Sequence, residues 1–418
     1  MKCRPKLPAN LSRPFLINRR GEVELTYDDL VARLAVKEYA PVLRPETTAE
    51  AVVGVLGAMA RGAALRLVDA DFSQQELRSL GLEESVISAR APLGGAAPKS
   101  LAEAQASARE SLGFCLELYT SGSTGLPKLV RHRLNSLTRT LRVGVNYSED
   151  VWALAFNPTH IAGIQVLLQA FFNGNTLVDV FGLPRDKVNH QLRCHSVSHL
   201  SATPTFYRLL LPLEDHLPTL RSITLGGERA DEFLLAKLRT GFPAAKIHNL
   251  YASTEAGTLL VSDGEFFGIH PALEGKVRIV EGRLVVAREL LAEFEGRSAD
   301  EWYSTGDRVE VVSEKPLRFS IIGRDNDFIN VGGAKVDPDE VESALREFSG
   351  VIEARVYGRR NSVVGTLLCA DYTSTLPLVE SELRLHLATR LQPHKVPRMI
   401  KKVHSIAKTR SGKLARNV

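Results

Sequence analysis

Residues 119–128 read YTSGSTGLPK, a short stretch rich in glycines and hydroxyl side chains that ends in a proline and Lys128. Glycines allow backbone N–H groups to approach an anion, and serine and threonine hydroxyls add further donors. The stretch does not match the G-x-x-x-x-G-K-[ST] loop, because its glycines are too close together and proline precedes the lysine. A surface turn would explain the glycines but not the full string, so a phosphate-binding loop is predicted. Its candidate ligands are Thr120, Ser121, Gly122, Ser123, Thr124 and Gly125.

The composition is that of an ordinary globular protein with two or three domains. The chain has 418 residues, of which 44% are hydrophobic and 24% charged, and its formal net charge is +5. The basic excess is modestly concentrated in 395–416, which is more typical of a solvated face than of a nucleic-acid site. No basic run carries interleaved aromatic residues, so nucleic-acid binding is not expected.

Cysteine spacing and hydropathy indicate where in the cell the protein is expected. The four cysteines are far apart and form no CxxC pair, so neither a zinc site nor a disulfide framework is indicated, and a cytoplasmic protein is expected. Residues 1–20 are basic but lack the apolar stretch of a signal peptide. The most apolar run, 51–68, contains Arg61 and Arg66, and no run reaches the roughly 18 residues of a membrane span, so no stable membrane insertion is expected.

Alternating helix and strand signals predict an α/β fold. Residues 25–35 are expected to form a helix capped by Thr26. Further helices are expected at 47–63, 136–145 and 161–174, and strands at 64–70, 114–120, 151–157 and 176–181. Such alternation is typical of mainly parallel sheets covered by helices.

The pattern changes after about residue 265, where glycine-punctuated short strands indicate a β-rich subdomain. A helix then begins in 336–348, with Asp337 as its cap, Pro338 at its first position and Glu340 closing a capping box. Strands at 352–358 and 362–372 and a helix near 381–391 complete a small α+β unit, which the resemblance described below implies to be mobile. We place the boundary at Gly323–Asp325, which gives a large domain of residues 1–323 and a small one of residues 324–418.

Five segments together resemble the adenylate-forming superfamily, which includes acyl-CoA synthetases, peptide-synthetase adenylation domains and luciferases. The stretch YTSGSTGLPK is similar to the phosphate-binding signature of that superfamily. The other segments follow in the same order: LYASTEAG (250–257), YSTGDR (303–308), GRDNDFINVGGAKVDPDEVE (323–342) and KTRSGKLAR (408–416). Each alone has an ordinary reading, such as a turn, a helix cap or a basic tail. The resemblance runs from about residue 25 to the end, with a shortened N-terminal subdomain that leaves monomer and homodimer both open.

The resemblance implies roles for particular residues. Thr254 and Glu255 would meet the α-phosphate of ATP and Mg²⁺, and a carboxylate suits that hard cation. The other implied catalytic residues are Lys128 and Lys413. The implied ATP site further contains Gly227, Glu228, Tyr251, Asp307 and Arg324, with Asp307 and Arg324 at the ribose. The implied acyl pocket contains His160, Gly226 and Ala252, the hinge is Asn326, and Gly332 and Gly333 would line the thiol channel.

Two of these segments depart from the usual pattern, and a third position, outside them, discriminates within the superfamily. Ala252 stands where glycine is usual, and Asn326 where aspartate or lysine is usual, although asparagine also tolerates unusual backbone angles. Ile161 stands where amino-acid-activating members place the aspartate that pairs with the substrate ammonium, so α-amino acids are not expected as substrates. His160 either borders the acyl pocket or is a structural histidine.

The implied activity has two half-reactions. A carboxylate attacks the α-phosphorus of ATP and gives an acyl-adenylate and pyrophosphate. A thiol, from CoA or from the phosphopantetheine of a carrier protein, then displaces AMP. The expected pocket wall comes from 157–165, 201–208 and 225–230, with Phe206 and Tyr207 as its bulky members, and it leaves fatty and aromatic acids both open.

A second reading is a non-catalytic nucleotide or acyl binder derived from such an enzyme. The presence of Glu255, Asp307, Arg324 and Lys413 argues against it.

Overall fold

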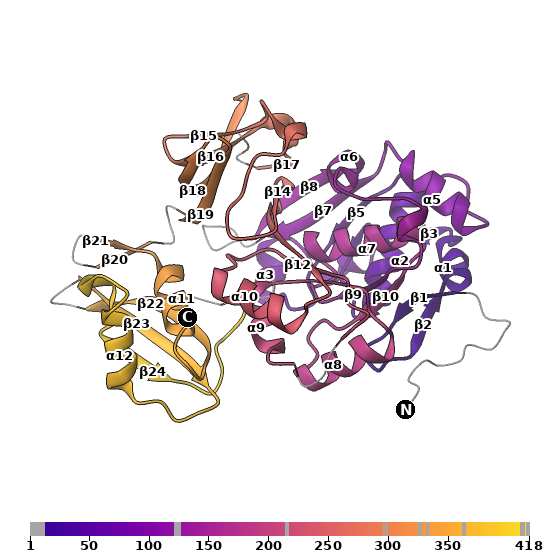
Figure 1. Ribbon diagram of the computed structural model, residues 1–418. Coiled ribbons are helices and arrows are strands. Elements are labelled where there is room, and N and C mark those ends of the chain that lie inside the picture. The colour runs from indigo at the N-terminus through magenta and orange to yellow at the C-terminus, as the bar shows by residue number, and fades with distance from the viewer. Residues whose placement is uncertain are drawn as a thin grey trace.

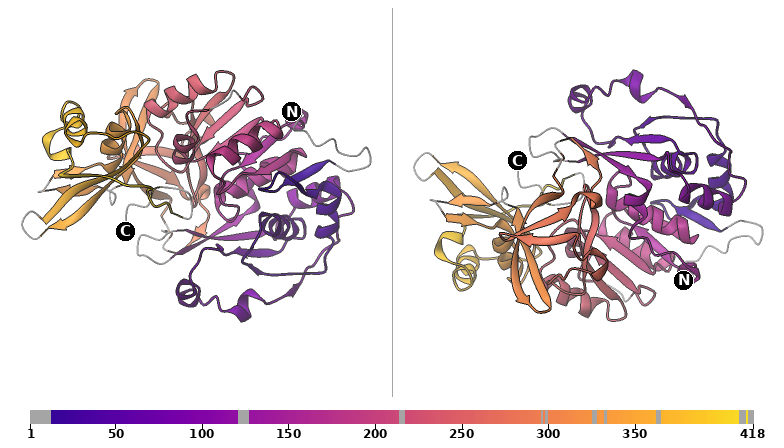
Figure 2. Two further views of the ribbon diagram at one scale, coloured as in Figure 1. Left: turned by 90° about the horizontal axis from the view of Figure 1, so that it is seen from below. Right: turned by 90° about the horizontal axis from the view of Figure 1, so that it is seen from above.

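The computed structural model describes residues 13–120, 127–213, 217–295, 297, 300–324, 328–331, 334–361, 365–409 and 414. Figure 1 shows a large body of helices and sheets, a small antiparallel sheet beside it, and a separate C-terminal α+β unit. In both views of Figure 2 the C-terminal unit and the N-terminal strands and helices lie at opposite ends of the molecule. The predicted α/β class is confirmed.

An eight-stranded sheet forms the centre of the large body, in the order β14-β13-β12-β11-β9-β10-β1-β2. The strands from β13 to β1 are parallel to their neighbours, and β14 and β2 are antiparallel edge strands. Their bounds are β1 Pro14–Ile17, β2 Val23–Thr26, β9 Val151–Leu154, β10 Thr176–Asp179, β11 His199–Ala202, β12 Ser222–Leu225, β13 Lys246–Ser253 and β14 Gly257–Ser262. Ligands of parallel sheets bind beyond the carboxyl ends of the strands, so this edge is where a site is expected.

A second, five-stranded sheet has the order β17-β8-β7-β5-β4. Its bounds are β4 Val42–Leu43, β5 Ala64–Leu67, β7 Cys115–Thr120, β8 Lys128–Arg133 and β17 Glu293–Phe294. Strands β7 and β8 are antiparallel, with Thr120 directly opposite Lys128. The expected phosphate-binding stretch therefore joins two paired strands, and its residues 121–126 lie outside the described part. Strands β3 (Glu38–Tyr39) and β6 (Ala91–Pro92) form a separate small pair.

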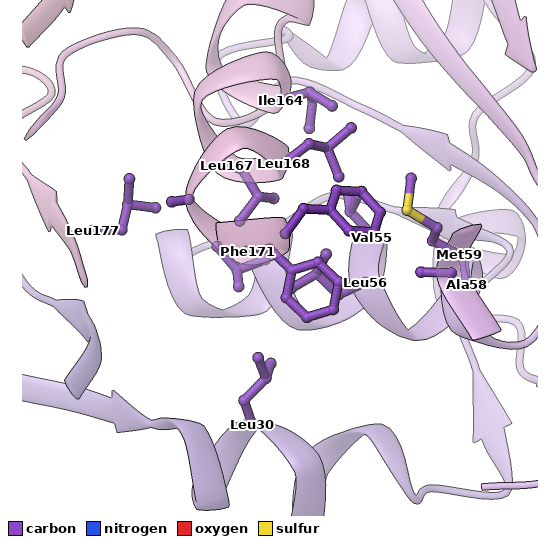
Figure 3. Packing of buried hydrophobic residues seen from close by; sticks show 14 of the residues in the cluster. Leu30, Val55, Leu56, Ala58, Met59, Ile164, Leu167, Leu168, Phe171 and Leu177 are labelled. Carbon is purple, nitrogen blue, oxygen red and sulfur yellow. The ribbon is translucent and has the colours of Figure 1, made fainter. Parts of the chain in front are cut away.

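Helices fill the space between these two sheets with apolar side chains. Helices α1 (Tyr27–Leu34), α2 (Thr48–Ala60), α5 (Leu101–Arg109) and α7 (Ile161–Asn173) contribute most of this core. Figure 3 shows Leu30, Leu56, Leu168 and Phe171 from three of them in one cluster, and none of the four is exposed to solvent. The predicted cap of α1 is confirmed, because the Thr26 hydroxyl accepts from the Asp29 N–H and the Asp29 carboxylate accepts from the Thr26 N–H.

The opposite face of the eight-stranded sheet is covered by other helices: α8 Arg185–Cys194, α9 Pro204–Leu210 and α10 Glu232–Gly241. Leu200, Ile223 and Leu225 point into this second core. Because side chains alternate along a strand, the residues between them point to the other face. That other face carries Ser201 and Thr224 and lines the cavity described below.

One predicted helix is too long. Helix α6 covers only Leu134–Thr138, whereas a helix over 136–145 was expected. Side chains of α7 bind the backbone that follows: the Gln169 amide oxygen accepts from the Arg142 N–H, and Asn173 accepts from the Gly144 N–H. These long-range hydrogen bonds replace the intrahelical ones. The remaining short helices are α3 Gln74–Ser79 and α4 Glu84–Ile87.

The β-rich subdomain is an antiparallel sheet in the order β15-β16-β18-β19. Its bounds are β15 Val277–Val280, β16 Arg283–Ala287, β18 Trp302–Glu314 and β19 Leu317–Arg324. Its apolar face packs with β14 and Phe294 in a core of its own.

The C-terminal unit has a separate apolar core that includes Val341, Leu345 and Leu383. Its elements are β20 Ile329–Val331, β21 Ala334–Val336, α11 Pro338–Arg346, β22 Val351–Asn361, β23 Gly365–Ser374, α12 Glu380–Ala388 and β24 Met399–Lys402. The boundary at Gly323–Asp325 stays a prediction. Within the described ranges, no helix is long and apolar enough to cross a membrane.

Two of the three predictions for the start of α11 are confirmed. Asp337 is the N-cap and accepts from the Asp339 N–H, and Pro338 occupies the first turn. The capping box is wrong, because the Glu340 carboxylate lies 2.8 Å from the Lys395 ammonium and forms an ion pair with it instead.

Candidate active site

A cavity of about 890 Å³ lies between the eight-stranded sheet and α7. Its floor comes from alternate residues of β11, β12 and β13, its roof from α7, and one wall from β14. At the carboxyl ends of the strands it is also lined by Thr409 of the C-terminal unit. The cavity thus lies at the sheet edge that parallel topology favours for ligands.

Several predicted site residues meet at this end of the cavity. Its lining includes the three expected acyl-pocket residues His160, Gly226 and Ala252, together with the expected nucleotide residues Thr120, Gly227 and Thr254. They come from four segments of the chain that are far apart in the sequence: the end of β7, the start of α7, the turn after β12 and the end of β13. Their individual roles stay predictions.

The turn after β12 explains why glycine is needed there. Gly227 has φ +85°, a left-handed conformation that side chains rarely adopt. This turn directs Glu228, whose carboxylate accepts from the Thr205 N–H at the start of α9 (2.9 Å) and from the Leu414 N–H of the C-terminal unit (3.1 Å). Glu228 therefore joins the large body to the segment that carries Lys413.

Thr254 and Glu255 lie in the turn between β13 and β14. The buried His132 ring contacts the Thr254 backbone, and burial lowers the pKa of His132 to about 4. A neutral histidine thus supports this turn at neutral pH.

Glu255 fits the expected magnesium role. Its side chain is half-buried and has no hydrogen-bond or ion-pair partner within the described part of the chain. Those same residues contain no cluster of three or more histidine, cysteine, aspartate or glutamate side chains suited to a metal. A Mg²⁺ ion at Glu255 would therefore take further ligands from phosphate oxygens and water, as this cation commonly does.

The expected ribose residues also converge. The Tyr251 hydroxyl donates a hydrogen bond to the Asp307 carboxylate, and Asp307 is only 5% exposed. Asp307 faces Arg324 across the β18–β19 pair. A carboxylate with two acceptor oxygens, held in place by a tyrosine, is suited to bind a vicinal diol.

Lys128 starts β8 opposite Thr120, and its ammonium lies 3.8 Å from the centroid of the Phe294 ring. This cation–π contact fixes the lysine at the end of the hairpin that carries the glycine-rich stretch. The remaining predicted residues lie outside the described part: Ser121, Gly122, Ser123, Thr124, Gly125, Asn326, Gly332, Gly333 and Lys413. Their roles stay predictions.

The sequence did not indicate Asp69, which follows β5 and lines the cavity. The His160 Nε2 atom lies 2.8 Å from the Asp69 carboxylate, and the Asn157 amide donates to the same oxygen at 3.2 Å. Burial would raise the pKa of Asp69, but these hydrogen bonds outweigh it and lower that pKa. His160 is thus both a cavity residue and a structurally held one. The partners are 91 positions apart, so no local signal could have joined them.

The expected wall is partly wrong. Ser201 and Thr203 do line the cavity, but Tyr207 does not, because it is fully buried in the core on the opposite face of the sheet. There its hydroxyl donates to the Leu200 carbonyl at 2.7 Å. Phe206 packs against that same core. The bulk expected from these two aromatic residues is therefore absent from the cavity lining, which leaves the cavity wider than expected.

Comparison with known proteins agrees with this arrangement. The AMP-binding enzyme family matches residues 83–278, and the AMP-binding enzyme C-terminal domain matches residues 340–413. The chain is 26% identical over 331 residues to a 2-succinylbenzoate–CoA ligase of Listeria monocytogenes, covering 72% of this chain and 68% of that protein. A 2-succinylbenzoate–CoA ligase of Bacillus subtilis is 28% identical over 332 residues, covering 72% and 67%.

Solved structures share the fold. The o-succinylbenzoate CoA synthetase of Bacillus subtilis, in complex with its acyl-adenylate intermediate, superposes with a TM-score of 0.70 at 22% identity. The match covers 98% of this chain and 95% of that one. An anthranilate CoA ligase in complex with anthranoyl-AMP gives a TM-score of 0.72 at 18% identity, over 98% and 93% of the two chains.

Both the large body and the C-terminal unit thus match domains of AMP-binding enzymes. The chain belongs to the adenylate-forming superfamily of AMP-binding enzymes, which confirms the predicted resemblance.

Proposed function

We propose that this chain is an ATP-dependent ligase that converts a carboxylic acid into an acyl-adenylate and then into its CoA thioester. Membership in the AMP-binding enzymes supports the first step. The relatives named as CoA ligases support CoA as the acceptor, in preference to a carrier protein.

One observation carries the proposal: the C-terminal segment meets the cavity. Leu414 donates its N–H to Glu228, and Thr409 lines the cavity itself. Lys413 directly precedes Leu414 in the sequence. A cation is needed here because the attacking carboxylate and the triphosphate repel each other, and preorganised charge lowers the barrier of such a step by several kcal/mol.

In the first step, a carboxylate oxygen of the acid attacks the α-phosphorus of ATP. A P–O bond forms and pyrophosphate leaves with the electron pair of the bond that breaks. Lys413 and Lys128 offset the negative charge, and Asp307 holds the ribose. When bound, Mg²⁺ supplies further positive charge beside the phosphates, and Glu255 would hold it.

In the second step, the CoA thiol releases its proton to the solvent, and its sulfur attacks the acyl carbonyl carbon. The carbon–oxygen bond to AMP breaks, and AMP leaves. The thiol needs the space beside the acyl carbonyl, so Lys413 must withdraw. We propose that residues 324–418 rotate as a unit about Asn326, and that Gly332 and Gly333 then line the thiol channel. The monomer or homodimer state and the cytoplasmic location stay predictions.

The experiment uses the full chain with ATP, Mg²⁺, CoA and a panel of carboxylic acids. AMP, pyrophosphate and acyl-CoA are quantified together by mass spectrometry and coupled assays. The proposal expects equal amounts of all three products with at least one acid. If AMP forms without acyl-CoA, and a thioester appears only when a phosphopantetheinylated carrier protein is added, the carrier protein would replace CoA as the acceptor. ATP binding without any product would favour the non-catalytic binder.

A further inference from the structure

The acyl cavity continues well past the end where the carboxylate would react. On its floor, Gly226 just after β12 lies four positions along the strand from Ser222, and Ala252 lies four positions from His248 on β13. At the usual strand rise this is about 13 Å. On its roof, Ile161 and Gln169 of α7 are eight residues apart, which is about 12 Å of helix. Two independent walls therefore give the same depth.

Small hydroxyl side chains keep this floor open. Ser201, Ser222 and Thr224 all face the cavity from adjacent strands. None of their hydroxyl groups has a hydrogen-bond partner within the described residues, and none is sealed from the cavity. Leucine or valine at these positions would close the floor, so the sequence maintains a long channel with polar groups exposed to its occupant.

The far end of the channel offers a hydrogen-bonding side chain, His248. The Trp152 ring there stacks on His199, but its Nε1–H is sealed from solvent and does not reach the channel. The His248 ring lines the channel and bonds to no other described residue. Burial, Arg142 and Lys246 lower the pKa of His248, so its ring is neutral at neutral pH and can donate one hydrogen bond and accept another.

Two arginines along the roof have no carboxylate partner among the described residues, although Asp69 and Asp150 line other parts of the cavity. Arg139 and Arg142 both line the channel, and the Arg139 guanidinium donates only to the carbonyls of Ala256 and Leu290 among the described residues. The Arg142 guanidinium is exposed to the channel and has no partner within that same part of the chain.

Another arginine, Arg221, shows the contrast. Arg221 at the base of the same sheet pairs with Asp150 at 2.7 Å. The fold therefore neutralises that arginine with a buried carboxylate but leaves Arg142 available to the occupant of the channel. Arginine next to an exposed channel of this kind is suited to bind a carboxylate with two parallel hydrogen bonds.

We propose that the channel selects an elongated acid that carries a second carboxylate, bound by Arg142 with His248 beside it. This inference rests on the proposed ligase function. An extended chain advances about 1.2 Å per backbone bond, so the depth corresponds to roughly ten chain atoms between the two carboxylates. A simple fatty acid of that length would leave the Arg142 guanidinium without a partner, which costs affinity.

The test compares three acids in ATP–pyrophosphate exchange with the full chain: dodecanedioate, dodecanoate and hexanedioate. We expect kcat/KM for dodecanedioate to exceed that for each of the other two by about tenfold, the effect of one hydrogen-bonded charge. Equal or better use of dodecanoate would contradict the proposed binding of a second carboxylate. Equal use of hexanedioate would contradict the proposed selection for an elongated chain. Failure of every acid in a broad panel would instead contradict the proposed function.

Variants test whether Arg142 causes the preference for the dicarboxylic acid. Arg142→Met should reduce the ratio of dodecanedioate to dodecanoate rates by about tenfold, and Arg142→Lys should retain part of the preference because the charge remains. Arg20→Met serves as the matched control, since Arg20 is an exposed arginine in the β1–β2 turn and does not line the channel. An unchanged ratio in a folded Arg142→Met protein contradicts the assignment. If that variant does not fold, the three-acid comparison on the unaltered chain still tests whether the channel selects an elongated acid with a second carboxylate.

Discussion

A buried ion-pair cluster joins the C-terminal unit to the large body, and breaking it should affect only one half-reaction. The Arg346 guanidinium of α11 lies 3.2 Å from the Asp231 carboxylate, with side chains that are 7% and 13% exposed. Arg208 approaches the same carboxylate at 2.9 Å, and the Ser343 hydroxyl donates to it at 3.3 Å. Burial alone would raise the pKa of Asp231, but the two arginines lower it to about 2.

The size of the effect follows from this geometry. Two unit charges 3.2 Å apart attract by roughly 5 kcal/mol at an effective dielectric constant of about 20. Desolvation of the two ions offsets more than half of that, and Arg208 remains as a partner for Asp231. A net loss of about 2 kcal/mol is therefore expected for Arg346→Met. It would shift the equilibrium between the docked and rotated orientations by about 30-fold.

The docked orientation is the one that brings the Leu414 N–H to Glu228. Arg346→Met should therefore slow adenylate formation by up to about 30-fold, while thioester formation from supplied acyl-adenylate is retained. Pyrophosphate exchange and single-turnover thioester formation are measured on the same preparation. Circular dichroism verifies that the variant is folded.

Two controls make the result decisive. Arg229 pairs with Asp337 across the same interface at 3.5 Å, and Arg229→Met should have a smaller effect in the same direction because that pair is more exposed. Arg390 pairs with Glu347 inside the C-terminal unit, both about half exposed, and Arg390→Met should change neither rate. Equal slowing of both half-reactions by Arg346→Met would refute the reasoning.

Four further outcomes are expected. Lys413→Ala should abolish adenylate formation and largely spare thioester formation from supplied acyl-adenylate, and equal loss of both would remove the lysine from its role. Asn326→Pro fixes φ near −65° and should change the ratio of the two half-reaction rates; an unchanged ratio means that Asn326 is not the hinge. No proteinogenic amino acid should support pyrophosphate exchange at the rate of a good acid, because Ile161 cannot pair with an ammonium. Stability should fall as the pH drops from about 6.5 toward 4, by about 1.4 kcal/mol per pH unit for His132, because the native state binds fewer protons than the unfolded state in that range; His132→Asn should reduce this slope in chemical denaturation, and an unaltered slope would contradict the buried neutral state.

Local features were predictable from the sequence because their partners are close in the chain. Thr26 and Asp337 cap their helices through backbone groups two or three residues away. The strand that ends at Thr120 was predicted, but its partner β8, which begins at Lys128, was not. The superfamily resemblance added the nucleotide residues, of which Tyr251 and Asp307 do form a hydrogen bond.

Features that depend on distant partners were not predictable. The backbone of Arg142 and Gly144 leaves the helical path because Gln169 and Asn173 bind it from another helix. The Glu340 carboxylate pairs with the Lys395 ammonium, 55 positions away, and therefore does not cap the N-terminus of its own helix. The pairing of His160 with Asp69 arises only when two sheets meet. The sequence pattern carries no signal for such contacts.

Acid-dependent exchange of labelled pyrophosphate into ATP tests the central claim most directly, because it reports reversible acyl-adenylate formation without any thiol. The account predicts exchange that requires both Mg²⁺ and a carboxylic acid, is highest for elongated acids, and is lost in Glu255→Ala and Lys413→Ala proteins that remain folded. Binding of ATP with no exchange for any acid in the panel would contradict it.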